Sequence, residues 1–207
     1  LVSAYNFTDN SHGDTRMTSK LKTDVLETVS GSGTIALTNQ LSGMTSASMP
    51  SGSVVQTLQA VFTATYASSS QSWVDTGISL SITPSSSSSK ILITVQFTAG
   101  GGNNSNPSFR LSGGNSGVYI GDAAGNRNRV SVSLGNDFGG TLGIQFGIPS
   151  SIVYLDSPAT ASAITYKVQA RTDGNGSWYI NRDGEDTDNS GEGWRGASSI
   201  TIQEIKG

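Results

Sequence analysis

Apolar and polar residues alternate along most of this chain from about residue 53 onward. Alternation with a period of two is typical of a β-strand that buries one face and exposes the other. The clearest example places Ile91, Ile93, Val95 and Phe97 at every second position. The same pattern predicts strands near residues 54–66, 78–82, 91–97, 118–120, 130–134, 142–148, 152–155, 164–170, 178–180 and 200–202.

The segments between these patterns are rich in residues that form turns. Gly, Asn, Ser, Asp and Pro gather at 84–89, 100–107 and 183–193, where they favour tight turns and positive φ angles. About nine or ten short strands at this spacing are typical of a sandwich or a jelly roll. The sequence therefore predicts one all-β, jelly-roll-like domain over residues 51–207.

The first fifty residues differ from this domain and predict an extended N-terminal arm over residues 1–50. Tyr5 and Phe7 lie in an otherwise polar stretch. Leu21 and Val25 lie four positions apart, which fits a short helix, although the surrounding residues also suit a strand. An arm without a core of its own usually attaches to a partner, and these four side chains are the candidate contacts. A plain linker is the alternative.

The composition excludes several classes of function. Apolar residues make up 34% of the chain, below the roughly 45–50% of ordinary globular domains. The net charge is -3 and no cluster of Lys or Arg occurs, so we do not expect nucleic-acid binding. No apolar stretch approaches the ~18 residues that span a bilayer, so we do not expect membrane insertion. A polar chain with a thin core is expected to gain stability by associating with itself.

The residues needed for common hydrolytic mechanisms are few. The chain has no cysteine, and its single histidine, His12, lies in the arm. A Ser-His-Asp triad would need that histidine in the β-domain. Glycoside hydrolysis needs two carboxylates held at a fixed separation, whereas the acidic residues here crowd one loop. They are Asp183, Glu185, Asp186, Asp188 and Glu192. We therefore expect no enzymatic activity.

The same acidic loop contains half of a calcium-binding pattern. The positions with calcium-loop spacing are Asp186, Asp188 and Ser190. Oxygen ligands at this spacing can converge on Ca²⁺, but Ala197 stands where such a loop carries its bidentate Glu. Calcium is thus the only candidate cofactor. The alternative is a solvated loop tied by Arg182 or Arg195.

Two loops carry candidate recognition residues. Trp178 and Trp194 flank the acidic loop, and aromatic rings beside Asp and Asn can stack on sugars. Asn103 and Asn104 lie in the Gly-rich loop 100–107. The alternative places either tryptophan in the interior or at a subunit interface.

Several longer motifs resemble one family of proteins. They are Met17–Ile35 (MTSKLKTDVLETVSGSGTI), Leu41–Gln56 (LSGMTSASMPSGSVVQ), Trp73–Ile93 (WVDTGISLSITPSSSSSKILI), Asn181–Arg182 and Arg195–Ile205 (RGASSITIQEI). Together they resemble small virion structural proteins of tailed bacteriophages, especially phages of cyanobacteria. The resemblance covers most of the chain from Met17 onward, and residues 1–16 precede it.

The resemblance implies a trimeric, jelly-roll-like protein on the virion surface, without enzymatic activity. It favours a tail fibre that recognises the host over a capsid decoration protein that stabilises the head. The expected partners are two further copies of the chain, a tail adaptor, fibre shaft or capsid protein, and a host surface glycan. A lectin-like carbohydrate-binding module is the second alternative.

Overall fold

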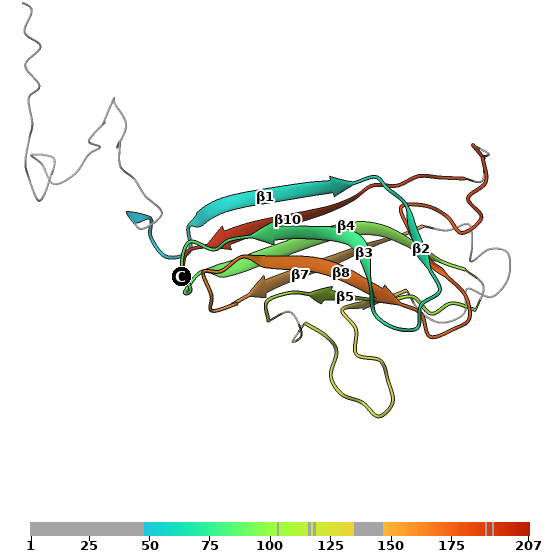
Figure 1. The fold of residues 1–207 in the computed structure, drawn as a ribbon, viewed down its shortest axis with the longest axis horizontal. Coiled ribbons are helices and arrows are strands. Elements are labelled where there is room, and N and C mark those ends of the chain that lie inside the picture. Colours follow the sequence, from blue (N-terminus) through green and yellow to red (C-terminus); the bar gives the residue numbers. More distant parts are fainter. Residues whose placement is uncertain are drawn as a thin grey trace, which may run out of the picture. The chain divides into compact units, whose positions relative to one another are not determined.

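The computed structural model describes residues 48–102, 104–115, 117, 119–134, 147–188, 190–191 and 193–207. Within them the chain forms two antiparallel β-sheets (Figure 1), so the predicted all-β class is confirmed. The strands are β1 (Val54–Phe62), β2 (Tyr66–Ser68), β3 (Val74–Ile82), β4 (Lys90–Gly101), β5 (Ser108–Ser112), β6 (Val132–Ser133), β7 (Ile148–Asp156), β8 (Ile164–Arg171), β9 (Trp178–Ile180) and β10 (Ser198–Ile205). None of these described residues belongs to a helix that is long and apolar enough to cross a membrane.

The first sheet contains β1, β2, β4, β7, β9 and β10. Two pairs of these strands lie end to end, so the sheet is four strands wide, and we call each of the four positions across the sheet a line. β4 pairs with β7 along one side and with β10 along the other. β9 pairs with the end of β4 on the same side as β10. β9 and β10 therefore form one line, which residues 181–197 interrupt. β2 and β1 pair with β9 and β10 in the same way and form the outermost line.

The second sheet has the strand order β3-β8-β5-β6. Its edge strand β3 contains an irregularity between Asp75 and Ser79. Gly77 adopts a positive φ of 87° there, and the Thr76 hydroxyl donates to the Val168 carbonyl at 2.9 Å. The extra residues bend this edge of the sheet.

The core lies between the two sheets and is filled by alternate residues of their strands. The predicted run on β4 is confirmed, because Ile91, Ile93, Val95 and Phe97 are all buried. Phe97 of the first sheet meets Phe109 of the second at a ring separation of 5.0 Å. Buried aromatic pairs of this kind stabilise the contact beyond the area that they bury.

A buried carboxylate fastens the β3–β4 turn to the first sheet. Glu204 of β10 points inward and accepts hydrogen bonds from Gln56 Nε2, Ser85 N, Ser85 Oγ and Ser89 Oγ at 2.6–2.7 Å. Burial acts to raise the pKa of Glu204, but the donors from Ser85, Ser89 and Gln56 outweigh burial and lower it. The carboxylate is therefore stabilised in its ionised form.

A second buried carboxylate holds the loop that follows β5. Asp156 at the end of β7 accepts from the Tyr166 hydroxyl at 2.6 Å and from Asn115 N at 3.0 Å. Burial, and then the hydrogen bond to Asp156, raise the pKa of Tyr166. A Cβ at Gly114 would clash with both the Asp156 carboxylate and the Tyr166 hydroxyl. Glycine at this position lets the loop approach the pair.

One predicted strand, near residues 118–120, is wrong, and one observed strand was not predicted. Tyr119 and Ile120 lie in bends rather than in a strand, and the Tyr119 ring packs against Tyr154 at 4.9 Å. Their apolar character therefore reflects packing of a loop. The strand β5 was not predicted, because only Phe109 and Leu111 alternate within it. The predicted strand segment 142–146 lies outside the described residues.

Candidate functional site

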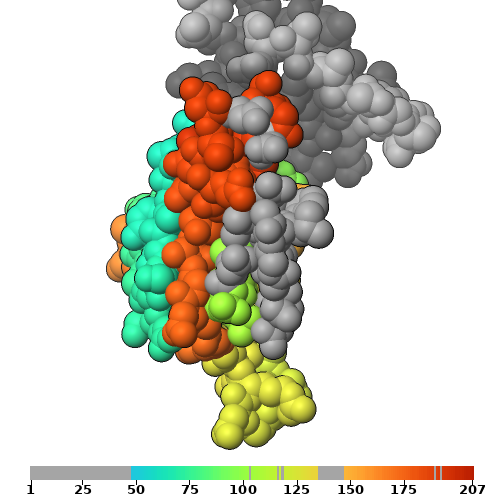
Figure 2. All heavy atoms as spheres, turned by 90° about the vertical axis from the view of Figure 1, so that its right-hand side faces the viewer, coloured from blue at the N-terminus to red at the C-terminus, as the bar shows by residue number. Residues whose placement is uncertain are grey.

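The two ends of the acidic loop, residues 181–197, lie side by side where the loop leaves the first sheet, and we call this base the neck. Asn181 is buried at a positive φ of 59°. Its side-chain amide donates to the carbonyls of Phe62 and Ala64, and its carbonyl oxygen accepts from the Ser198 hydroxyl at 2.7 Å. The backbones of Arg182 and Arg195 then form an isolated antiparallel β-bridge. Both ends of the loop are therefore held at one end of the first sheet, the end that faces the viewer in Figure 2, where the orange-red atoms of this part of the chain are visible.

A buried carboxylate organises the inside of this loop. Asp183 accepts hydrogen bonds from Asp186 N at 2.6 Å and from Trp194 N at 3.0 Å, so it joins the outgoing and returning arms. Burial acts to raise the pKa of Asp183, but the backbone donors, led by Trp194 and Asp186, lower it overall. Asp183 is thus an anion held by backbone N–H groups.

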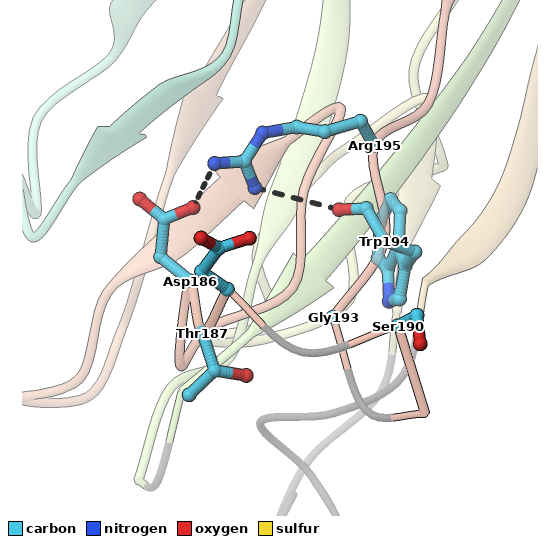
Figure 3. Close-up of a pocket in the computed structure, with 7 residues that line it drawn as sticks. Asp186, Thr187, Ser190, Gly193, Trp194 and Arg195 are labelled. Carbon is cyan, nitrogen blue, oxygen red and sulfur yellow. Dashed lines mark hydrogen bonds and ion pairs between the residues drawn. The ribbon is translucent and has the colours of Figure 1, made fainter.

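Ion pairs fix the outer part of the loop. The Asp186 carboxylate pairs with the guanidinium of Arg195 and lies 3.6 Å from that of Arg182. Arg182 also lies over the ring of Tyr179, 4.6 Å from its centroid. Figure 3 shows the Asp186 carboxylate facing the Arg195 guanidinium. The loop is tied by both arginines, which is the alternative that the sequence left open.

Beside this ion pair lies an open hollow of about 390 Å³. Its lining combines an aromatic ring with hydroxyl, carboxylate and guanidinium groups. The lining residues are Asp186, Thr187, Asp188, Ser190, Gly193, Trp194 and Arg195 (Figure 3). We call this the Trp194 hollow. The lining residues are thus mostly polar, with one aromatic ring among them.

The Trp194 ring is seated against the first sheet. A Cβ at Gly147, just before β7, would clash with the indole and with Thr98 of β4. Thr98 also lines a neighbouring hollow of about 430 Å³, together with Gln96, Phe97, Pro149, Ser150, Ser151 and Ala197. Trp194 and Thr98 both lie close to Gly147 and Gly196, so one residue from each hollow is found at this place on the first sheet.

The three predicted calcium ligands, Asp186, Asp188 and Ser190, all line the Trp194 hollow. The Asp186 carboxylate, however, is paired with two guanidinium groups. Positive charge beside a carboxylate opposes the binding of a divalent cation. In the described part of the chain, no group of three His, Cys, Asp or Glu side chains is arranged to hold a metal ion.

The other predicted site residues have different outcomes. The prediction that Trp178 takes part in recognition is wrong, because Trp178 is fully buried and its ring stacks on that of Tyr66 with 5.4 Å between the ring centroids. Asn104 is exposed at a positive φ of 56°, and its carbonyl accepts from Gly176 N. Asn103 lies outside the described residues, as do the predicted arm contacts Tyr5, Phe7, Leu21 and Val25.

Sequence analysis missed the residues that shape the hollow. In the sequence Asp183 is one of several crowded carboxylates, and nothing around Gly147 distinguishes this glycine from the others. An Asp that follows the Asn-Arg pair at the end of β9 was the available indication for Asp183, since Asp often binds nearby backbone N–H groups. The role of Gly147 depends on a contact with a residue 47 positions away and has no local indication.

Comparisons with known proteins give no family for this chain. No protein-family model matches it, and neither does any curated protein.

Proposed function

We propose that this chain is a non-enzymatic structural protein of a bacteriophage virion surface. Its β-domain is a trimeric jelly roll, its N-terminal arm attaches it to the particle, and its Trp194 hollow binds a host surface glycan. This combination is that of a tail fibre with a role in host recognition.

The order of strand pairing supports the jelly roll. The pairs are nested: β5 pairs with β6, β4 with β7, β3 with β8, and β1 with β10. Successive pairs alternate between the second and the first sheet. A long hairpin that folds over itself in this way gives the two Greek keys of a jelly roll, a fold found in viral capsid and lectin domains. A fold alone does not determine function, so the recognition role must be argued from the site.

The observation that carries the recognition role is the Trp194 hollow. Asp183 and the neck hold its loop in place, so a ligand meets a surface that is already formed. The indole offers an apolar face for a sugar ring, while Thr187, Asp188 and Ser190 offer hydroxyl and carboxylate groups to its hydroxyls. Three such hollows on one trimer would convert weak binding into strong attachment.

The pKa of Asp183 supports a structural role for this residue rather than that of a catalytic acid. A glycosidase needs a carboxylic acid that is still protonated near the working pH, and burial must raise its pKa. The backbone donors around Asp183 have the opposite effect and lower its pKa. Asp183 is thus suited to hold the loop and unsuited to protonate a leaving group.

Replacement of the indole tests the recognition role. We expect Trp194→Ala to weaken binding to host cells or to a bound glycan by ~5- to 150-fold, since stacking and burial of one aromatic ring are worth roughly 1–3 kcal/mol. Trp73→Ala is the matched control, because Trp73 is a partly buried tryptophan covered by Arg110 at the start of the second sheet. Equal loss in both variants, or in neither, would contradict the assignment of the site.

Labelling of intact particles tests the virion role. A gold-labelled antibody against the β-domain should mark the tail of the particle. Label spread over the head would identify a capsid decoration protein instead. Particles without label, together with calcium-dependent glycan binding by a monomer, would favour the lectin-like module.

A further inference from the structure

The two sheets present very different outer faces to solvent. All of the exposed large apolar side chains among the described residues belong to strands of the first sheet: Val54, Val61, Tyr66, Val153 and Leu155. Tyr66 stacks on the buried Trp178, but the other four are not covered by described neighbours. Val61, Val153 and Leu155 are 62%, 52% and 48% exposed. Val54 and Val61 lie on β1, whereas Val153 and Leu155 lie on β7, on the other side of β10 and β4. Exposed apolar side chains on both sides of one sheet face mark it as a candidate contact surface.

The strand register places outward residues of the first sheet in rows. One row contains Thr57, Gln203, Leu92 and Leu155, and the next contains Gln59, Thr201, Thr94 and Val153. A third contains Val61, Ser199, Gln96 and Ser151, and Val54, Ile205 and Lys90 lie at the end. We call this surface the row face. Its only charged side chain is Lys90, at the margin.

The outer face of the second sheet is charged and its groups are paired with one another. Asp75 accepts from Lys167 at 2.7 Å and from Gln169 at 2.8 Å. Gln169 in turn accepts two hydrogen bonds from Arg110, at 2.8 and 3.0 Å. Burial of this face in a subunit contact would desolvate these charged groups, which costs free energy. The contrast singles out the row face as the surface that association would cover.

We infer that the row face is the surface through which copies of this chain associate, an inference that rests on the trimer of the proposed function. A surface with almost no charge can meet a copy of itself without repulsion between like charges. A differently charged partner would instead require complementary charges on this face. Threonine and glutamine side chains, such as Gln59 and Thr201 at 2.9 Å, already bond to each other within the face.

The extent of the row face fits the centre of a subunit contact. Four lines about 4.8 Å apart and four rows about 6.8 Å apart cover roughly 500 Å², more than half of the ~800 Å² that each partner buries in a stable interface. The apolar rows lie toward the end of β10, whereas the acidic loop precedes its first residue, Ser198. The apolar rows therefore lie away from the Trp194 hollow, whereas the third row shares Gln96 and Ser151 with the neighbouring hollow.

Insertion of a charge into the row face tests the inference. The variant is Leu155→Lys in the full chain, and the matched control is Ser81→Lys, an exposed strand position on the outer face of the second sheet. We expect Leu155→Lys to raise the dissociation constant of the oligomer at least ~100-fold, because a buried unpaired charge costs several kcal/mol. Ser81→Lys should leave it unchanged. Analytical ultracentrifugation measures both, and circular dichroism confirms that both are folded.

A second measurement does not depend on disrupting the protein. The chain has no cysteine, so Thr201→Cys and Ser81→Cys each provide one unique position for a spin label. Labels on the row face should be close together across subunits, and labels at position 81 should be farther apart.

The possible outcomes test the role of the row face separately from the proposal that the chain forms a trimer. A trimer that survives Leu155→Lys with distant labels at position 201 would overturn the inference and leave the trimer intact. The same result with loss of incorporation into particles would assign the row face to another virion protein. A dimer that Leu155→Lys dissociates would overturn the trimer and support the row face. A chain that is monomeric at all concentrations would overturn both.

Discussion

Two buried carboxylates, Asp183 at the loop end and Glu204 at the turn end of the first sheet, use hydrogen bonds for different purposes. Glu204 accepts three of its four bonds from side chains and joins a turn to two strands. Asp183 accepts from backbone N–H groups on both arms of one loop. The first arrangement connects elements of the fold, and the second sets the conformation of a loop. Changes at Glu204 should therefore affect stability most, and changes at Asp183 should affect recognition most.

The largest expected effect is loss of stability in Glu204→Ala. Removal of the carboxylate takes the acceptor from the buried Ser89 hydroxyl and from the more exposed donors of Gln56 and Ser85, and leaves a buried space, which together should cost about 3 kcal/mol. For a chain of this size that corresponds to a fall in Tm of about 10 °C, measured by calorimetry. Glycan binding of the folded fraction should be unchanged.

Two variants sharpen this test. Glu204→Gln keeps one carbonyl acceptor and should lose less stability than Glu204→Ala. Glu185→Ala removes an exposed carboxylate and should leave Tm unchanged within about 1 °C. If Glu204→Ala were as stable as Glu185→Ala, the role of Glu204 would be wrong.

The second effect is a loss of loop order in Asp183→Asn. The amide keeps one acceptor but directs an N–H group at a backbone donor, so we expect about 1–2 kcal/mol of destabilisation. Hydrogen exchange should accelerate in residues 184–195, and glycan binding should fall about 10-fold as the Trp194 hollow loses its shape. Asp122→Asn, at an exposed position in another loop, is the control for all three measurements. Unchanged binding in Asp183→Asn would break the contrast between the two carboxylates.

The third effect is the pH dependence of stability. The pKa values of Glu204 and Asp183 are lower in the folded chain than their unfolded values of about 4.3 and 3.9. The unfolded chain therefore binds protons first, so these groups stabilise the fold fully above about pH 5 and lose that contribution as the pH falls through their folded pKa values. Tm should fall between about pH 5 and 3, and less steeply in Glu204→Gln. Parallel curves for Glu204→Gln and the unaltered chain would contradict the shift.

The sequence predicted where strands form better than it predicted which strands pair with one another. Alternation identified β4, β8 and β10 because each buries one face against the other sheet. It missed β5, whose two apolar residues are too few to define a period. Pairing of β1 with β10 joins residues about 145 positions apart, and no local pattern encodes such a distance.

The site shows the same limit. The spacing of Asp186, Asp188 and Ser190 indicated a cation, but Arg195 reaches Asp186 only because β9 and β10 form one line and bring the two arms of the loop together. Trp178 and Trp194 were equally good candidates for recognition by their sequence surroundings. Their difference is one of position: Trp178 points into the core from β9, and Trp194 lies on the acidic loop.

The smallest effect concerns the ion pairs of the acidic loop and any response to calcium. Partly exposed pairs contribute little, so a double-mutant cycle of Asp186→Ala and Arg195→Ala should give a coupling of about 0.5 kcal/mol. With both guanidinium groups present, Ca²⁺ and EDTA should give the same Tm within about 1 °C. Arg195→Ala removes one competing charge, so this variant should show the stronger response to Ca²⁺. A calcium-dependent rise in the Tm of the unaltered chain would mean that the arginines yield to the ion, and the loop would then be organised by a metal as well as by Asp183.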